Sequence, residues 1–258
     1  MNHASIRKPS RGLFTIIFEG RTGSSFIVSC LNSHPNVLCY PEILADSGPA
    51  VQKKLLKALI EGRPIEAINP KVAQPRYFHG DVNGKTDLQR VGFKTKLNQI
   101  GYRRLEAFHY FLERHRFKLI YLKRRNIVKS VLSLYNAERL RKKYRSSNAE
   151  NEHQIQGPIY IDPERFIQDL ERREKLERAH EKFYQAFGLD KQIFYYEDLI
   201  QSQNLFLSHL LAFLGVKGIP LKGKFLKNTP DSLCDAVLNY EEFHKRLSGT
   251  RFEHCLEK

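Results

Sequence analysis

Residues 13–26, which read LFTIIFEGRTGSSF, decide the fold class of this chain. The run from Leu13 to Phe18 is apolar and rich in β-branched residues, and glycines bound it, which predicts a short buried strand. From Ser24 to Ser33 apolar residues recur at helical spacing, so a helix is expected there. The stretch therefore predicts a strand, a tight loop and a helix in immediate succession.

The loop between this strand and this helix has the composition of an anion site. Gly20 and Gly23 permit a sharp turn and a close approach of a ligand to the backbone. The first amides of a helix are unpaired and carry a positive partial charge, and Arg21 adds a fixed charge. We therefore predict that the loop cradles a phosphate-like group, with a plain turn capped by a serine as the alternative. Further donors to this cradle are the hydroxyl groups of Thr22, Ser24 and Ser25.

Apolar runs with strand character alternate with amphipathic segments along the rest of the chain. This alternation implies a mostly parallel sheet with helices on both faces. We therefore predict an α/β fold in a single domain, residues 1–258 with a core of about residues 13–252, that opens with a P-loop-like strand, loop and helix. Further strands are expected at 91–94, 117–122 and 193–196, and further helices at 51–61, 103–114, from 126, 163–187, 205–214 and 235–247. The irregular residues 62–84 are a candidate acceptor-binding loop.

The net charge of +15 predicts an anionic partner, which could be a polyanionic small molecule, a membrane surface or nucleic acid. The densest basic run, residues 139–145, is most simply explained as a solvated helix end. A nucleic-acid-binding protein stays an alternative, although the aromatic residues fall mainly in expected strands and helix faces. We therefore expect no nucleic acid as partner.

The cysteines and the apolar runs exclude further classes. The four cysteines, at positions 30, 39, 234 and 255, form no CxxC pair and have no histidine at metal spacing, so no metal site is expected. The first twelve residues lack the apolar stretch of a secretory signal, and no run approaches the length of a membrane span. We expect a cytoplasmic protein without a transmembrane segment.

A second basic motif follows the expected strand at 117–122. Arg125 and Asn126 end this strand and open a helix, and Ser133 comes eight residues after Arg125. Eight residues are about two helical turns, so both side chains could reach one phosphate, which arginine can bind in bidentate fashion. A basic helix cap with a surface serine is the alternative. In parallel sheets ligands bind beyond the carboxyl ends of the strands, where both motifs are expected to lie.

These motifs resemble those of the sulfotransferases that depend on 3′-phosphoadenosine 5′-phosphosulfate (PAPS). The run Arg21-Thr22-Gly23-Ser24-Ser25 matches the 5′-phosphosulfate loop of that family, in the Arg-first form of its bacterial and carbohydrate branches. Arg125 and Ser133 match the register of its 3′-phosphate site, although Ile127 replaces the usual proline. The resemblance extends in patches over residues 13–252. It further implies adenine contacts from Phe26 and from Tyr196, which lies in a Tyr-Glu-Asp-Leu segment.

The resemblance also implies the chemistry. PAPS would be the sulfuryl donor, no metal would be needed, and Arg21 and Lys94 would meet the transferred group. The cytosolic branch uses a histidine base in a Lys-Thr-His-Leu segment, but here lysine stands at position 96. We therefore expect Glu42 to be the base, with pairing of this glutamate to a nearby cation as an equal alternative. Weaker base candidates are His79 and His109.

The expected reaction is sulfuryl transfer by in-line displacement from PAPS to an acceptor hydroxyl. The Arg-first loop and Glu42 favour a carbohydrate or other aliphatic alcohol over a phenol, and the basic surface suits an acidic glycan or glycolipid. A small-molecule kinase or similar nucleotide-phosphate transferase is the alternative enzyme. It would need the GxxxxGK[ST] loop and a carboxylate for magnesium, and the sequence places neither.

Overall fold

The parallel sheet of this computed structural model is built on the strand that the sequence indicates most clearly. The structure describes residues 11–70, 74–79, 85 and 87–256. Within them the strands are paired in parallel in the order β2-β3-β1-β4-β5, with β1 at the centre. This confirms the predicted α/β class with a parallel sheet. The strands are β1 (Gly12–Phe18), β2 (Val37–Tyr40), β3 (Arg90–Thr95), β4 (Lys118–Lys123) and β5 (Lys191–Tyr195).

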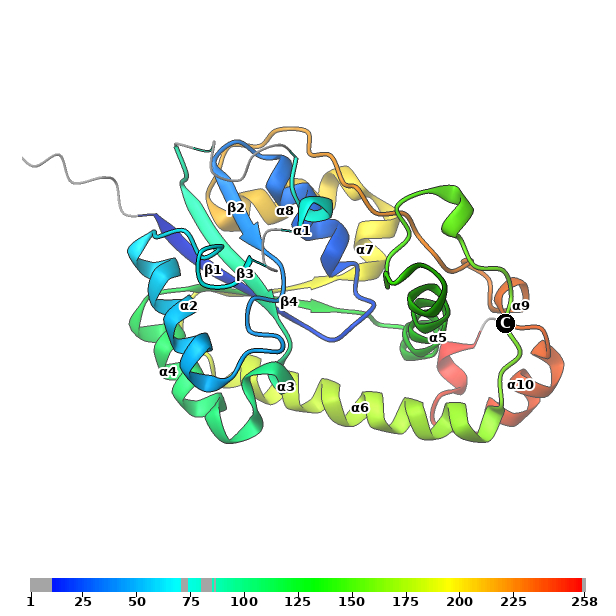
Figure 1. Ribbon diagram of the computed structural model, residues 1–258. Helices are drawn as coiled ribbons and strands as arrows, with labels where there is room; N and C mark the ends of the chain where they lie inside the picture. Colours follow the sequence, from blue (N-terminus) through cyan, green and yellow to red (C-terminus); the bar gives the residue numbers. More distant parts are fainter. Residues whose placement is uncertain (1–10, 71–73, 80–84, 86, 257–258) are drawn as a thin grey trace, which may run out of the picture.

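Helices cover both faces of the sheet (Figure 1). In the view of Figure 1, α1 and α8 lie above the sheet, and the long α6 runs below it beside α4. The helices are α1 (Ser24–Ser33), α2 (Pro49–Glu61), α3 (Leu97–Ile100), α4 (Leu105–Arg114), α5 (Ile127–Tyr144), α6 (Pro163–Ala186), α7 (Tyr196–Gln201), α8 (Gln203–Leu214), α9 (Leu233–Ala236) and α10 (Tyr240–Leu247). Short 3₁₀ turns are η2 (Pro75–Tyr77), η3 (Tyr102–Arg104), η4 (Glu152–Gln154) and η5 (Glu253–Cys255).

Successive side chains of a strand point to opposite faces of the sheet, so their contacts show which helices cover which face. Phe93 of β3 makes an edge contact with Phe108 of α4, and Phe108 stacks on Phe183 of α6. On the opposite face, Phe194 of β5 packs against Phe206 of α8. Apolar side chains thus leave the sheet on both sides, which explains why the strands read as continuous apolar runs.

Several elements differ from the sequence-based expectation, among them the four-residue helix α3, which was not predicted. Strand β2 was not predicted, because its four residues follow directly on the helix end at His34 and show no alternation. Helix α7 was not predicted either, since it spans only six residues. The expected helix at 235–247 is divided into α9 and α10, which flank an extended stretch at Val237.

A second hydrophobic cluster lies beside the sheet core and joins α5, α6 and the C-terminal segment. Phe166 of α6 makes edge contacts with Tyr135 of α5 and with Phe243 of α10. Asn126 fixes the start of α5, because its side chain accepts a hydrogen bond from the amide of Lys129. This packing holds α5 against α6 and the C-terminal segment, and α5 forms one wall of the cavity described below. Among the helices of the described residues, none has the length and apolar character that a membrane crossing requires.

Candidate functional site

A cavity of about 1000 Å³ opens at the carboxyl ends of the strands. Every strand of the sheet ends at a cavity-lining residue, as expected for ligand sites of parallel sheets. The contributors, in chain order, are Gly20, Arg21 and residues 23–26 after β1, Glu42 after β2, Lys94 on β3, Lys96 just after β3, Arg124 after β4 and Tyr196 after β5. Part of the candidate acceptor loop at 62–84 falls outside the described residues. Of its described part, Ile68, Asn69, Gln74, Arg76 and Tyr77 line the cavity.

The loop after β1 has the shape of an anion cradle. Arg21 and Gly23 both adopt left-handed backbone conformations, with φ of 73° and 74°. Glycine suits such a φ, and a Cβ on Gly23 would lie 3.1 Å from the ring of Tyr196. Helix α1 then begins without a side-chain cap and without an acidic residue in its first turn. Its first amides are therefore open to an anion.

The structure brings most of the predicted donor-site residues together around this cradle. All of the predicted loop residues line the cavity except Thr22, whose buried hydroxyl donates to the Glu19 carbonyl at 3.1 Å. This corrects the expected position of the Thr22 hydroxyl, because the side chain braces the turn instead. Phe26, Ser133 and Tyr196 also line the cavity.

Arg124, rather than Arg125, points into the cavity. Arg125 lies on the outside, where its guanidinium donates to Asp198 at 2.6 Å and covers the ring of Tyr195 at 3.9 Å. Arg124 is buried, donates to the Arg21 carbonyl at 3.3 Å and lies over the Tyr196 ring at 4.4 Å. Arg125 is therefore not among the lining residues, and its assignment to the 3′-phosphate stays a prediction that this geometry does not support. The two arginines are neighbours, so their side chains leave the chain in different directions.

Arg21 and Arg124 form a pair of cations whose hydrogen-bond partners are neutral. Arg21 donates to the Ser133 hydroxyl at 3.1 Å and to the Ser147 carbonyl at 2.8 Å. In the described part of the chain neither guanidinium lies in an ion pair, and the buried Nε of Arg124 has no hydrogen-bond partner. Burial and the neighbouring charge of Arg124 lower the pKa of Arg21 to about 10. The burial of the two guanidiniums and the repulsion between their charges both favour binding of an anion, which would relieve this repulsion.

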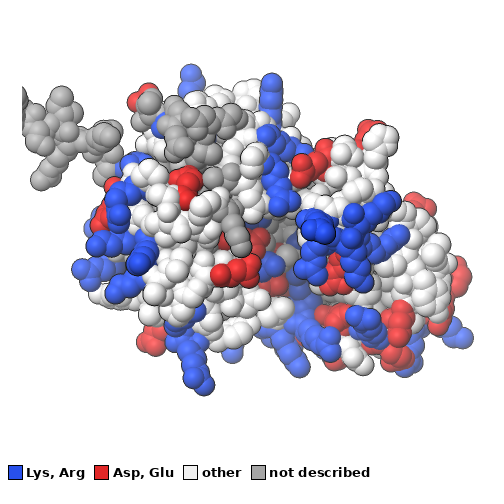
Figure 2. Space-filling view, viewed as in Figure 1, with Lys and Arg blue, Asp and Glu red and all other residues white. Residues whose placement is uncertain are grey.

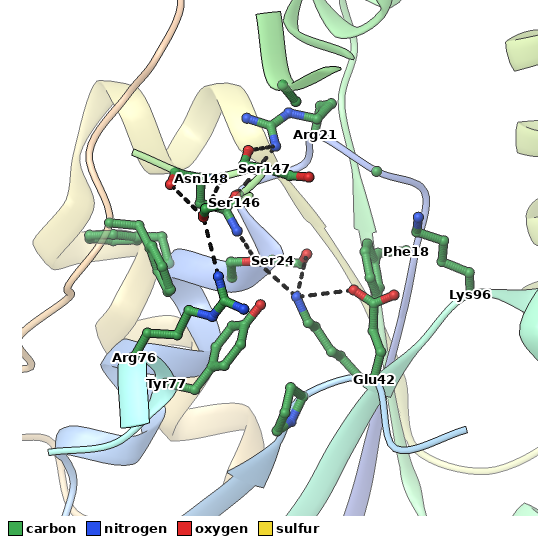
Figure 3. A pocket seen from close by; sticks show the side chains of 18 of the residues that line it. Phe18, Arg21, Ser24, Glu42, Arg76, Tyr77, Lys96, Ser146, Ser147 and Asn148 are labelled. Atoms are coloured by element: carbon green, nitrogen blue, oxygen red, sulfur yellow. Dashed lines mark hydrogen bonds and ion pairs between the residues drawn. The ribbon is translucent and has the colours of Figure 1, made fainter. Parts of the chain in front are cut away.

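Lys94 lies between the two serines of the cradle and Glu42. Figure 3 shows Ser24 and Glu42 in this pocket. Its buried ammonium group donates to Ser25 at 2.9 Å and to Ser24 at 3.4 Å. On the other side the ammonium lies 3.5 Å from Glu42 Oε1. The rings of Phe18 and Tyr77 face it at 5.0 and 5.2 Å from their centroids. Lys94 thus connects the predicted anion site with the predicted base.

The carboxyl group of Glu42 is set up to stay ionised. Burial raises its pKa, but the charges of Lys94 and Lys96 and a hydrogen bond from Gln99 outweigh burial and hold the pKa below its usual value of 4.5. Both interpretations of this glutamate fit the geometry, because Glu42 pairs with Lys94 and also lines the cavity. The histidines considered as bases, His79 and His109, are not among the lining residues.

Replacing Lys96 with glutamine should raise the pKa of Glu42. Because the pKa is lowered, the carboxylate form persists to below pH 4.5 and is lost as the pH falls through the lowered value. Removal of the Lys96 charge weakens this lowering of the pKa, so the titration of Glu42 moves to higher pH. Carbon-13 NMR titration of the Glu42 carboxyl measures it directly. Lys182→Gln removes the same charge from the exposed face of α6 and should leave the titration in place. An unchanged titration in Lys96→Gln would contradict the electrostatic assignment.

Several lining residues were not predicted individually from the sequence, and three of them are Lys227, Asn148 and Arg76. Burial and the nearby charges of Arg124 and Lys129 lower the pKa of Lys227, which also pairs with the exposed Asp231. Asn148 links two loop residues, since its amide donates to Ser25 at 3.2 Å and its oxygen accepts from Arg21 at 3.3 Å. Both lie in loops without a motif, so only the fold brings them to the site. The third residue is Arg76, in η2.

A buried charge cluster supports the loop from the side of α6. Arg173 donates to the Gly20 carbonyl at 2.8 Å and lies 3.7 Å from Glu19, with Glu177 at 3.1 Å. His180 lies 3.7 Å from the same Glu19, and burial lowers its pKa. Glu19 Oε1 is buried and has no hydrogen-bond partner in the described structure. Arg173 is therefore the main counter-charge that allows Glu19 to be buried at the start of the loop.

Comparison with known proteins finds sulfotransferases among solved structures. No protein-family model matches this sequence, and no curated protein matches it either. The chain is similar to a sulfotransferase from Alicyclobacillus acidocaldarius, with 15% identity, a TM-score of 0.46 and coverage of 86% of this chain and 87% of the other. It is also similar to the sulfotransferase domain of the Synechococcus PCC 7002 olefin synthase, with 20% identity, a TM-score of 0.42 and coverage of 82% and 77%. A mouse sulfotransferase in complex with PAP matches with 13% identity, a TM-score of 0.43 and coverage of 81% and 61%.

Proposed function

We propose that this chain transfers a sulfuryl group from PAPS to an acceptor hydroxyl. The observation that carries the proposal is the pair Arg21 and Arg124, two guanidiniums that share the cavity with an uncapped helix start and without a carboxylate partner among the described residues. Charged groups in such surroundings are costly unless an opposite charge joins them. A ligand with more than one anionic group satisfies both cations and the helix start.

PAPS carries two separated anionic ends, and the cavity offers a counterpart for each. The 5′-phosphosulfate would lie on the amides at the start of α1, between Arg21 and Lys94. The 3′-phosphate would lie near Ser133, with Arg124 and Lys227 as its cations. A volume of about 1000 Å³ is at the upper end of the usual range for ligand sites, so a nucleotide and a second substrate fit together.

The transfer itself needs charge neutralisation and a proton acceptor. The acceptor oxygen forms a bond to sulfur, the bond from sulfur to the 5′-phosphate oxygen breaks, and PAP leaves with that electron pair. Lys94 would stabilise the charge that develops on the sulfuryl and leaving oxygens. Glu42, ionised at neutral pH, would take the proton of the acceptor hydroxyl. Lys94 lies between Glu42 and the two serines, Ser24 and Ser25. An acceptor hydroxyl at Glu42 would therefore approach the sulfur from the side opposite the leaving group.

The acceptor class proposed is a carbohydrate or another aliphatic alcohol. Lysine at position 96 occupies the place where the resemblance to the cytosolic branch would put a histidine, and a carboxylate takes the basic role here. The Arg-first loop also resembles the bacterial and carbohydrate branches. Both features favour an aliphatic hydroxyl over a phenol as the acceptor.

Substitution of the two adjacent arginines tests where the 3′-phosphate binds. Arg124→Gln should weaken PAP binding by about 1.5–3 kcal/mol, the usual contribution of a hydrogen bond to a charged group. Arg125→Gln removes the same charge one residue further on, outside the cavity, and should leave PAP affinity nearly unchanged. Isothermal titration calorimetry measures both. The reverse order of effects would return the phosphate site to Arg125.

A further inference from the structure

One wall of the cavity carries arginines that the donor does not require. Arg76 in η2 and Arg141 and Arg145 at the end of α5 all line the cavity. In the residues that the structure describes, no ion pair engages any of the three. The whole lining contains more cations than carboxylates. Its cations are Arg21, Arg76, Lys94, Lys96, Arg124, Arg141, Arg145 and Lys227, and its carboxylates are Glu42, Asp46 and Glu138.

Arg76 is the most informative member of this wall. Its guanidinium is half-buried and donates to Gln74 Oε1 at 2.9 and 2.7 Å and to the Ser146 hydroxyl at 3.2 Å. All of these partners are neutral side-chain oxygens, which an incoming anion could replace. Figure 3 shows Arg76 on the same side of the site as Tyr77 and opposite Glu42. The guanidinium lies in the cavity lining and is directed at Ser146.

The basic end of α5 reaches the same space from another element. Lys and Arg side chains gather there on the surface (Figure 2). Cations are favoured at any helix C-terminus, which accounts for part of this cluster. That preference does not explain Arg76, which belongs to η2 and is hydrogen-bonded to Ser146 just beyond α5. Two separate elements, η2 and the end of α5, thus contribute to the cavity lining arginines that form no ion pair within the described residues.

We propose that the acceptor is an anionic hydroxyl compound, a uronate or a sulfated sugar, whose carboxylate or sulfate group is bound by Arg76 and Arg145 while its hydroxyl lies at Glu42. This inference rests on the proposed function and specifies its second substrate. Arginine can bind either oxyanion with two parallel hydrogen bonds. The donor's anionic ends are already matched by Arg21, Lys94, Arg124 and Lys227, so a further anion has to come from the acceptor.

The test compares three sugars that differ in charge. D-glucuronate, glucose 6-sulfate and methyl glucoside are titrated into the protein saturated with PAP, and binding is followed by saturation-transfer NMR. Either anionic sugar should bind about tenfold or more tightly than the neutral one, and Arg76→Gln should abolish this preference. Lys142→Gln is the matched control, because it removes the same charge from the end of α5 outside the cavity lining.

Each outcome decides the inference. Equal binding of all three sugars would overturn it, as would a preference that survives in Arg76→Gln or is lost equally in Lys142→Gln. A preference for glucuronate alone identifies the anion as a carboxylate, and a preference for glucose 6-sulfate alone identifies it as a sulfate ester. PAP titration of the same samples separates the two proposals, because Arg76→Gln should bind PAP like the unaltered protein. Failure of the unaltered protein to bind PAP would instead contradict the proposed function.

Discussion

Glu42→Gln should lower turnover by about a hundredfold or more, the usual contribution of a general base. The amide can still accept a hydrogen bond, but it cannot take the proton of the acceptor hydroxyl. Binding of PAP should persist, because the cradle residues and Arg124 are untouched. The loss of the negative charge 3.5 Å from Lys94 should favour binding of the anionic donor, if it has any effect.

The measurement is the rate of sulfate transfer from labelled PAPS, together with calorimetry of PAP. Glu150→Gln serves as the control, since it removes a carboxylate from an exposed position outside the cavity lining. Near-normal turnover in Glu42→Gln would mean that the base lies elsewhere and that Glu42 only pairs with Lys94. Lost turnover with lost PAP affinity would indicate a damaged site and would equally contradict the assignment as base.

Arg173→Ala should lower the free energy of unfolding by about 3–5 kcal/mol, because it leaves a buried charge without its partner. Arg173 lies between Glu19 and Glu177, and Glu19 is buried at the start of the loop. His180 also lies 3.7 Å from Glu19, but burial lowers its pKa in the unaltered protein. The Gly20 carbonyl loses its donor as well, so the cradle should also lose rigidity.

The neighbouring residue supplies a control for this experiment. Arg172 pairs with Asp169 at 2.8 Å, but its side chain is 69% exposed. Exposed ion pairs contribute at most about 1 kcal/mol, so Arg172→Ala should have a small effect. Denaturant titration of both variants gives the two free energies. Equal effects would show that the cluster at Glu19 does not carry the stability assigned to it.

The sequence alone predicts the centre of this fold well, for a physical reason. A β-branched run bounded by glycines, followed by apolar residues at helical spacing, permits few structures other than β1, its loop and α1. The same local chemistry points to Ser24 and Ser25 as cavity residues, since a helix start needs partners for its amides. Strand β2 could not be found in this way, because four apolar residues have no distinguishable period.

The remaining site residues depend on directions that spacing does not specify. Arg124 and Arg125 are adjacent and chemically identical, and Asp198 and Tyr195, seventy or more residues away, hold Arg125 outside the cavity. Asn148 has no motif around it and reaches Ser25 because the loop after α5 lies beside the start of α1. Long-range packing therefore selects which of several suitable side chains enters the site.

Binding of PAP compared with ATP tests the central claim most directly. PAP has a 3′-phosphate for Arg124 and Lys227, whereas ATP has a triphosphate that would need the loop and magnesium site of a kinase. Titration calorimetry of the unaltered protein should give saturable binding of PAP without magnesium, at least about tenfold tighter than ATP with magnesium, since two charge-assisted contacts are lost. Tighter binding of ATP, or no binding of PAP at all, would contradict the proposal that this cavity binds a sulfuryl donor.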